Sequence, residues 1–537
     1  MPATLPMKSS RRFLSPEPTV VLTKAFAEPF RNAIATARTC YSGKGIVTDE
    51  QVGTGYDALA RSIYQAGHHT TLQHAHFQFA LSNVSRQFIW SFLHSHPFYN
   101  SEQVSQRYVA LDPESVAVPP LEGEALALYR RTVARQMSAY ADLSERLRPL
   151  ADREWAALFP RARKHFARDV QKKAQEIARY VVPVAAFSYL YHTISGVTLL
   201  RYYRLCRQHD APLEQDLVVG KMVEALLEFD PRYLTILEEP MDPAATPEAA
   251  FFGETPYDPA RARAFREEFD AGLGGRVSKL IDYKQRNEAV VADAVREVLG
   301  LTASALSDRE AIELALDPAK NRLLGESLNL TTHAKLPRAL VHASYTFRKK
   351  LSHTADSQDQ RHRMTPGSRP ILAAHLTDDP DFITPELIRQ DPAIERDYRA
   401  VMDEAWDAIG RLRRMGVPDE FALYLLPNAA AVRFTESADL LNLRHKHAMR
   451  LCYNAQEEIW RAAKDERRHR GPAREKNEEV GGPFGPPFLP GDDAWTQTSG
   501  GSVTDLRSPC RRRRPCHRGR QGVHPHRRQR RRRSWRR

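Results

Sequence analysis

The sequence of 537 residues contains only five cysteines, and none of them belongs to a CxxC pair. Cys510 and Cys516 lie close to the C-terminus, while Cys40, Cys206 and Cys452 are far apart and have no histidines at a spacing typical of zinc sites. This pattern is typical of a reduced, cytoplasmic protein, and it predicts no bound metal.

Long apolar runs are also missing. No stretch of about 18 apolar residues could span a membrane, and no N-terminal segment has the apolar core of a signal peptide. A Gly-x-Gly-x-x-Gly fingerprint is absent as well, so a dinucleotide would have to bind without a Rossmann turn. Apolar residues make up 42% of the chain, an ordinary globular value. We therefore expect a soluble protein with no membrane partner.

Acidic residues are absent from the last 31 positions, which hold 15 arginines from Arg507 onward. The rest of the chain carries 64 basic and 66 acidic residues, so the net charge of +13 comes from this tail. Three interpretations compete: an arm that binds nucleic acid, a solubilising extension, or the translation of a wrong reading frame. In each of them the tail, residues 471–537, is expected to be disordered.

An internal repeat organises the remainder of the chain. EIARYVVPVAAFSYLYHTISGVTLLRYYRLC, from Glu176 to Cys206, resembles EFALYLLPNAAAVRFTESADLLNLRHKHAMRLC, from Glu420 to Cys452, with a gap of two residues. SEQVSQRY, from Ser101, resembles SQDQRH, from Ser357. The sequence predicts a first repeat at residues 1–240, a connector at 241–284 and a second, partly degenerate repeat at 285–470.

Both strands and helices are expected. HAHFQFAL, from His74 to Leu81, alternates like a half-buried strand. The stretch from Asp439 to Glu466 has no glycine or proline and is predicted to be one long helix. Arg450 would lie opposite its apolar stripe and, by composition alone, face solvent. The stripe comprises Leu441, Ala448, Cys452, Ala455 and Ile459, and the face of Arg450 comprises Leu443, His447, Asn454 and Glu457.

The segment NSEQVSQRYV, which starts at Asn100, carries chemistry that suits a phosphate. In an extended segment Ser105 and Arg107 project the same way, so a hydroxyl and a planar guanidinium are presented together. Upstream, GHHTTLQH, from Gly67 to His74, crowds polar groups before a strand. A lone Ser-x-Arg is weak evidence and histidine clusters are often at the surface, so the signal lies in the order of these motifs.

That order resembles flavin-dependent thymidylate synthase. The resemblance rests on ARTCYS (Ala37 to Ser42), HHTTLQHAHFQF (His68 to Phe79), SEQVSQRYV and the pair LYLLP…RLCYNAQEEIWR, and it covers most of residues 20 to 470. It implies an α+β fold with two tandem repeats that form a pseudo-dimer. It also implies reductive methylation of dUMP to dTMP, with FAD as cofactor and with NADPH and methylenetetrahydrofolate as co-substrates. The family is a homotetramer, so we expect a pseudo-tetramer of two chains.

The resemblance also assigns roles to residues. Ser105 and Arg450 would be catalytic, with Arg450 polarising the uracil ring. The Ser-loop and the arginine before the proline would come from one repeat and the ring-activating arginine from the other, giving one complete pocket. Predicted substrate contacts are Gln103, Ser105, Gln106, Arg107, Arg179 and Arg450, and predicted cofactor contacts are His68, Thr70, Gln73 and His96.

The chain departs from the family pattern at several positions. The signature Arg-His-Arg, seven residues before the serine, would be Ser95-His96-Pro97 here. A literal Arg-His-Arg at Arg361–Arg363 is interpreted as a decoy, because the repeat comparison places Arg361 opposite Arg107 and Asp359 opposite Ser105. The family's Asn and Arg on the last helix would be Asp439 and Leu441.

These departures leave three hypotheses open. The first is an active, fused thymidylate synthase with one site for each pair of repeats. The second is a degenerate paralogue that binds flavin or nucleotide without making thymidylate. The third, less favoured, is a nucleic-acid-binding protein that uses its arginine-rich tail.

Overall fold

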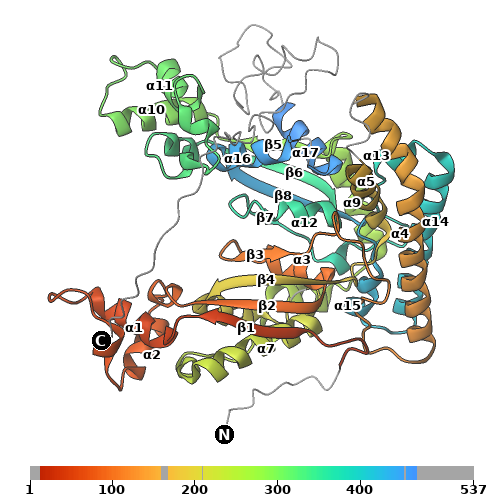
Figure 1. Cartoon of the computed structure of the whole chain (residues 1–537), viewed down its shortest axis with the longest axis horizontal. Coiled ribbons are helices and arrows are strands. Elements are labelled where there is room, and N and C mark those ends of the chain that lie inside the picture. The colour runs from red at the N-terminus through yellow and green to blue at the C-terminus, as the bar shows by residue number, and fades with distance from the viewer. Residues whose placement is uncertain (1–11, 159–166, 209, 453–454, 469–537) are drawn as a thin grey trace, which may run out of the picture. The chain divides into compact units, whose positions relative to one another are not determined.

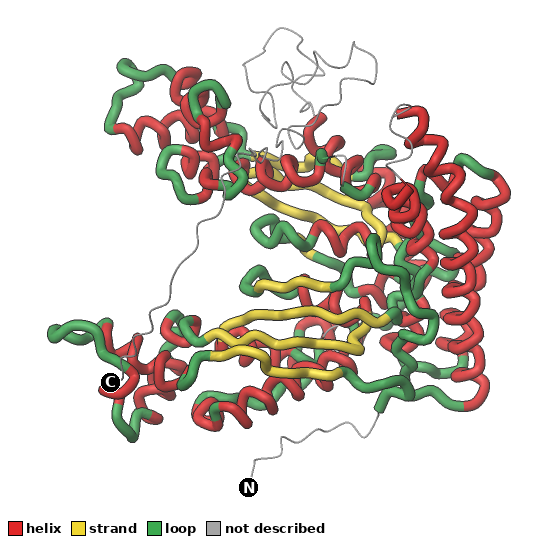
Figure 2. Tube along the Cα trace, in the orientation of Figure 1, coloured by secondary structure: helices red, strands yellow, loops and turns green. Residues whose placement is uncertain are grey.

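The structure, a computed structural model, describes residues 12–158, 167–208, 210–452 and 455–468 (Figure 1). The arginine-rich tail lies outside these residues, as does Asn454. Two four-stranded antiparallel sheets are combined with helices, which confirms the predicted α+β fold. Figure 2 shows the strands of both sheets and the helices packed around them.

The first sheet has the order β1-β2-β4-β3. The predicted strand is confirmed as β2, in which Phe77, Phe79 and Leu81 alternate toward the core and are at most 1% exposed. The strands are β1 (Thr19–Ala25), β2 (His76–Ser85), β3 (Asn100–Gln103) and β4 (Phe187–Ser195).

The second sheet has the equivalent order β5-β6-β8-β7, which confirms the tandem duplication. Its first strand lies within residues 241–284, the segment predicted to be a connector. The strands are β5 (Ser278–Tyr283), β6 (Ser344–Ser352), β7 (Gly367–Ser368) and β8 (Ala431–Asp439).

Helices repeat in the same order around the two sheets. Those of the first repeat are α1 (Pro29–Thr39), α2 (Asp57–Gln65), α3 (Arg86–His94), α4 (Gly123–Leu158), α5 (Ala167–Ala178), α6 (Gly196–Leu205) and α7 (Pro212–Phe229). α8 (Pro247–Glu254) and α9 (Pro259–Leu273) lead to the second sheet. Those of the second repeat are α10 (Asn287–Leu299), α11 (Asp308–Leu316), α12 (His353–Asp359), α13 (Glu386–Arg389), α14 (Pro392–Arg414), α15 (Asp419–Ala422), α16 (Leu440–Arg450) and α17 (Glu457–Arg468).

The prediction of one helix from Asp439 to Glu466 is wrong. Asp439 ends β8 and caps α16 by accepting the N–H of Asn442 at 2.9 Å, and a separate helix, α17, begins at Glu457. The first repeat breaks at the same place, where Pro212 starts α7. The second repeat has Gln456 at that position, so no proline in its sequence indicates that the helix ends there.

The two repeats are superposable in sequence without a gap over their C-terminal parts. β8 begins 244 residues after β4, and α16 begins 244 residues after α6. The expected gap of two residues is therefore wrong. The constant offset places Arg450 at the position of Cys206.

Backbone hydrogen bonds join the repeats in reciprocal pairs. Val184 N–H donates to the Leu426 carbonyl at 2.8 Å, and its counterpart Asn428 donates to the Val182 carbonyl at 2.8 Å. The long helices α4 and α14 pack against each other beside this junction (Figure 1). One continuous apolar core includes residues of both repeats, as expected of a pseudo-dimer.

Candidate nucleotide site between the repeats

A tight turn follows β3 and carries the predicted serine and arginine. The Ser105 carbonyl accepts the N–H groups of Tyr108 and Val109 at 3.1 Å, and the Ser105 hydroxyl accepts the N–H of Arg107 at 3.3 Å. Just before the turn, the Gln103 side chain accepts a hydrogen bond from Arg86 at 2.6 Å.

Arg107 forms an ion pair with Glu176 of α5. Lys173 donates to the same carboxylate at 2.9 Å. Burial favours the neutral acid, but Lys173, Arg107 and Arg179 outweigh it and lower the pKa of Glu176. The carboxylate is therefore ionised and fixes Arg107 at the edge of the site.

Arg179 lies in the 3-10 turn Arg179–Val181 and is only 3% exposed. Its guanidinium donates to the Gln456 side chain of the second repeat at 2.9 Å. Asn428, also of the second repeat, donates to the Gln106 side chain at 3.2 Å and to the Arg179 carbonyl at 3.0 Å. Gln106 and Arg179, which belong to the first repeat, thus contact side chains of the second repeat.

Arg450 ends α16 and donates to the Gln358 carbonyl of α12 at 2.7 Å. Burial lowers the pKa of Arg450, and nearby Arg361 and Arg107 lower it further while Asp359 opposes them. Leu443 and His447, assigned to the face of Arg450 in the sequence, are buried as well. The expected solvent-facing side of this helix is therefore inside the molecule.

The comparison that made Arg361 a decoy is wrong. Arg361–Arg363 follow α12 at the place where Ser95–Pro97 follow α3. The register of the short strands shows this independently, because Gly367 pairs with Glu436 as Ser101 pairs with His192. By that register Ile371 and Ala373 stand where the first repeat has Ser105 and Arg107. Counted from the capping serines Ser85 and Ser352, Asp359 of α12 stands where α3 has Phe92.

Arg361 and Arg363 reach across to the first repeat. Arg361 forms an ion pair with Glu102 of β3 at 3.2 Å. Arg363 donates to the Asn100 side chain at 3.2 Å and lies over the Tyr99 ring, 5.3 Å from its centroid. The literal Arg-His-Arg motif was the feature of the sequence that could have identified these residues. The match between SEQVSQRY and SQDQRH pointed away from it.

Five arginines of both repeats form one electropositive group, called the arginine cluster below. Burial together with Arg179 and Arg361 lowers the pKa of Arg86. Among the described residues, several buried polar atoms in this region have no hydrogen-bond partner, including Arg450 Nε, Arg86 Nε and Gln106 Nε2. Gathered guanidinium groups with unused donors suit an anion such as a phosphate. The cluster comprises Arg86, Arg107, Arg179, Arg361 and Arg450.

The reciprocal place between the repeats has lost this chemistry. Ile371, Ala373, Leu423 and Cys206 occupy the positions of Ser105, Arg107, Arg179 and Arg450. A carboxylate is found there instead, since Asp210 accepts the Leu372 N–H at 2.9 Å. An apolar lining with an acid would repel a phosphate.

The predicted cofactor residues lie on the first repeat. His68, Thr70 and Gln73 are exposed, around a 3-10 turn (Thr71–Gln73) that packs against α1 and α6. His96 is half-buried against Tyr202, and burial together with Arg201 lowers its pKa to about 4.

A second histidine with similar surroundings follows α12. Burial, Arg450 and Lys446 lower the pKa of His362 to about 2. Within the described residues, Nε2 of His362 and Nε2 of His96 have no hydrogen-bond partner. Each ring is therefore neutral with one nitrogen unused.

The described ranges contain neither a candidate metal site nor a candidate membrane span. No cluster of three or more His, Cys, Asp or Glu side chains there could hold a metal ion. No helix in these ranges is long and apolar enough to cross a membrane.

Known proteins give a consistent set of matches. The family model described as thymidylate synthase complementing protein matches residues 21–232 and 279–470. Flavin-dependent thymidylate synthase of Clostridium tetani is 25% identical over 194 residues, which are 34% of this chain and 72% of that protein. The enzyme of the same name from Mycobacteroides abscessus is 31% identical over 124 residues, 22% of this chain and about half (49%) of the relative. That from Nitratidesulfovibrio vulgaris is 28% identical over 227 residues, 40% and 85% of the two chains.

Solved structures are also similar. The UMP/dUMP methylase PolB from Streptomyces cacaoi, bound with 5-Br dUMP, matches with a TM-score of 0.30 and 18% identity. The match covers 41% of this chain and 96% of that one.

Proposed function

The chain belongs to the thymidylate synthase complementing protein family, and from that membership we propose that it is a flavin-dependent thymidylate synthase with one working nucleotide site per chain. The relatives that carry this activity in their names support the reaction, the reductive methylation of dUMP to dTMP. The observation that carries the proposal of a single site is the arginine cluster, whose counterpart between the repeats is apolar and acidic.

The nucleotide phosphate is proposed to bind at the Ser105 turn. The Ser105 hydroxyl and the guanidinium groups of Arg107 and Arg361 supply charge-assisted donors from both repeats. Arg179, Gln103 and Gln106 hold the first-repeat side of this pocket through their contacts with Gln456, Arg86 and Asn428.

Arg450 is proposed to contact the uracil ring. It lies at the end of α16, and its Nε is buried with no partner among the described residues. A guanidinium at a ring carbonyl stabilises the negative charge that develops when the ring is activated for attack at carbon 5. Because this donor is already fixed by the Gln358 carbonyl, it requires little reorganisation during the reaction.

The residues after α12 fit a flavin dinucleotide. Arg361 and Arg363 offer two cations for a diphosphate, and His362 and His96 each have a buried, unused ring nitrogen. When bound, FAD supplies the hydride that the methylation requires. Methylenetetrahydrofolate and NADPH are proposed as co-substrates. His68, Thr70 and Gln73 remain proposed cofactor contacts, and we propose a cytoplasmic pseudo-tetramer of two chains.

One observation favours a second candidate, a paralogue that binds nucleotide or flavin without making thymidylate. Asp439 and Leu441 stand where the family has an asparagine and an arginine. Asp439 caps α16, and Leu441 is 5% exposed in the core. The visible absorption band of oxidised flavin in the purified protein, followed by an assay of dTMP formation, separates the two candidates.

Calorimetric titration with dUMP tests the proposed site. We expect one dUMP per chain, with Arg107→Ala and Arg361→Ala each weakening binding about 30- to 150-fold, which corresponds to about 2–3 kcal/mol for a charge-assisted contact. Arg396→Ala, which replaces an exposed arginine on α14, is the matched control.

Arg450→Lys keeps the charge but loses the planar fork of the guanidinium, so turnover should fall about 100-fold. Two dUMP molecules per chain, or an unchanged affinity in Arg361→Ala, would contradict the proposal.

A further inference from the structure

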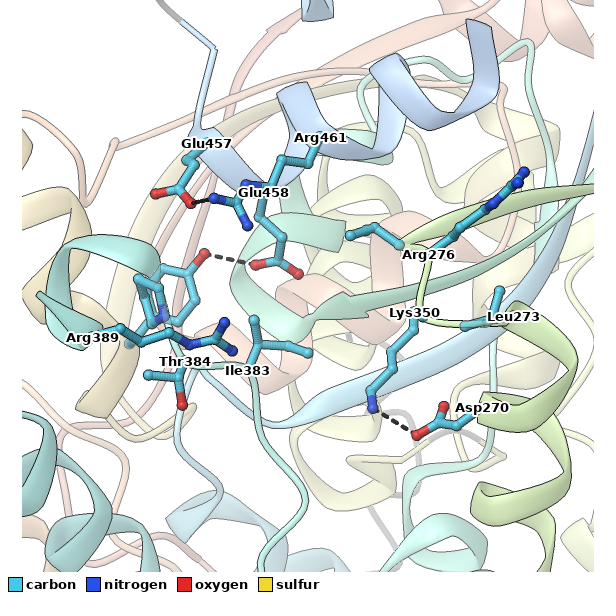
Figure 3. A pocket seen from close by; sticks show the side chains of 14 residues that line it. Asp270, Leu273, Arg276, Lys350, Ile383, Thr384, Arg389, Glu457, Glu458 and Arg461 are labelled. Carbon is cyan, nitrogen blue, oxygen red and sulfur yellow. Dashed lines mark hydrogen bonds and ion pairs between the residues drawn. The ribbon is translucent and has the colours of Figure 1, made fainter. Parts of the chain in front are cut away.

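A cavity lies beside Tyr180, whose hydroxyl accepts a hydrogen bond from Gln456. Its volume is about 300 Å³, and it lies between the end of α9, β6, the segment before α13 and the start of α17 (Figure 3). The Tyr180 hydroxyl and the Glu458 carboxyl meet at its wall. Four cationic side chains line it, those of Arg276, Lys350, Arg389 and Arg461.

The corresponding place in the first repeat is filled. Tyr424, the counterpart of Tyr180, packs edge-to-face against Phe13, with ring centroids 5.9 Å apart. Phe13 is 8% exposed, and Leu14 N–H donates to the Val118 carbonyl at 2.8 Å. An N-terminal segment therefore closes the first repeat where the second repeat keeps a cavity.

The side chains at the two places also differ: those of the second repeat are polar where those of the first repeat are apolar. Glu457 and Arg461 stand where the first repeat has the buried Leu213 and Leu217. Thr384 stands where it has Val118, since Ile383 and Ala117 donate to equivalent carbonyls of the two repeats. The second-repeat cavity is thus polar and open at a place where the same fold elsewhere builds apolar core.

The charges of the lining favour an anion. Lys350 is paired with Asp270, and Arg461 with Glu457 and Glu386. The side chain of Arg389 makes no hydrogen bond or ion pair within the described ranges, and Figure 3 shows it beside Thr384 and Ile383. We propose that this cavity binds a small organic anion, through a carboxylate or phosphate group held by Arg389.

A hydrogen-bonded chain connects the cavity with the nucleotide site. Tyr180 donates to Glu458 at the cavity wall and accepts a hydrogen bond from Gln456, which in turn accepts from Arg179. An anion that moves Arg389 or Glu458 therefore changes the support of Arg179. This coupling rests on the proposed function, whereas the binding of the anion does not.

Calorimetric titration of the full-length protein with citrate and, separately, with inorganic phosphate tests the inference. We expect saturable binding of one anion per chain for at least one probe. Arg389→Ala should weaken it about tenfold or more, as expected for losing a charge-assisted contact. The double variant E457L/R461L, which installs the first-repeat side chains, should abolish it, and Arg396→Ala should leave it unchanged.

One further variant and one measurement on the wild-type protein separate this cavity from the arginine cluster. Binding of the anion should persist in Arg107→Ala, and it should alter the affinity for dUMP in the wild-type protein. The inference is overturned if neither probe binds, if Arg389→Ala and E457L/R461L bind as the wild type does, or if Arg107→Ala alone removes binding. If dUMP does not bind at all, the proposed function fails while the anion titration still decides this inference.

Discussion

The Tyr180 hydroxyl of the first repeat donates to the Glu458 carboxylate of the second repeat at 2.7 Å. Their counterparts form the mirrored bond, Tyr424 to Glu214, at 2.5 Å. Each glutamate also accepts the hydroxyl of the serine that caps the helix after the second strand, Ser352 in one case and Ser85 in the other. These two buried bonds join the repeats as a symmetric interface would join two subunits.

Replacing Tyr180 by phenylalanine should destabilise the fold. The change removes one buried hydrogen-bond partner from Glu458 and one from Gln456, which costs on the order of 1–3 kcal/mol. Urea unfolding of Tyr180→Phe gives the difference, with Tyr189→Phe, a 58% exposed tyrosine on β4, as the control. Equal stability of the two variants would mean that the bond across the repeats contributes nothing.

The duplication could be predicted because Tyr-x-x-Pro recurs in both repeats. The proline lies at the junction of the repeats, and the tyrosine donates the hydrogen bond that joins them. Pro183 and Pro427 lie opposite each other at the junction, next to Tyr180 and Tyr424. The error in the offset came from a coincidence, since Arg-Leu-Cys occurs at Arg204 and again at Arg450. Only the paired strands show that the true counterpart of Arg450 is Cys206.

The place of Arg361 was harder to predict. α3 and α12 share little sequence because their buried faces differ: Phe92 in one helix corresponds to Asp359 in the other. A match of Ser, Gln and Arg in two short strings therefore outweighed a motif that was correctly placed. Gln358 and Gln456 carried no signal at all, because their role depends on contacts between segments about 100 residues apart.

Gln456 is expected to position the nucleotide site. It is fully buried, accepts from Arg179 and Gln358, and donates to Tyr180, so it joins both repeats at one side chain. Gln456→Leu should weaken dUMP binding about tenfold or more, because two buried donors lose their acceptor. Gln65→Leu, an exposed glutamine at the end of α2, is the control.

Steady-state kinetics distinguish this role from a direct catalytic one. If Gln456 positions Arg179, the variant should raise the KM for dUMP more than it lowers kcat. A pure loss of stability with unchanged KM and kcat would contradict the positioning role.

A buried ionic group in the second repeat replaces an aromatic one in the first. Lys349 Nζ lies 2.9 Å from Asp359, 3.0 Å from Glu436 and 2.7 Å from Glu466, and Lys446 also contacts Asp359. The first repeat has apolar or aromatic side chains at these places, namely Leu81, Phe92, His192, Met222 and Tyr202.

Lys349→Met should be strongly destabilising. Removing one partner leaves three buried carboxylates with a single lysine and a neutral histidine, and breaking such a group costs about 3–5 kcal/mol. Lys24→Met, an exposed lysine on β1, is the control. Thermal or urea unfolding provides the measurement, and a difference of less than about 1 kcal/mol between the two variants would show that the group is well hydrated.

Asp210 should make stability depend on pH. Burial raises its pKa from 3.8 to about 7, although the Leu372 N–H favours the ionised form. Because the native state holds this proton more tightly than the unfolded chain does, its contribution to stability is complete below about pH 4 and declines as the pH rises to about 7. Three pKa units correspond to about 4 kcal/mol, and the partial exposure of the side chain reduces this to about 2 kcal/mol.

Asp210→Asn keeps an acceptor for Leu372 but has no proton to lose. The variant should therefore gain stability relative to the wild type between pH 4 and pH 7 by about that amount. Urea unfolding across this range gives the comparison, with Asp403→Asn, an exposed residue of α14, as the control. Parallel stability curves for the wild type and Asp210→Asn would show that the carboxylate in the reciprocal pocket is ionised at all of these pH values, and that a negative charge, in place of a phosphate, holds the Leu372 turn.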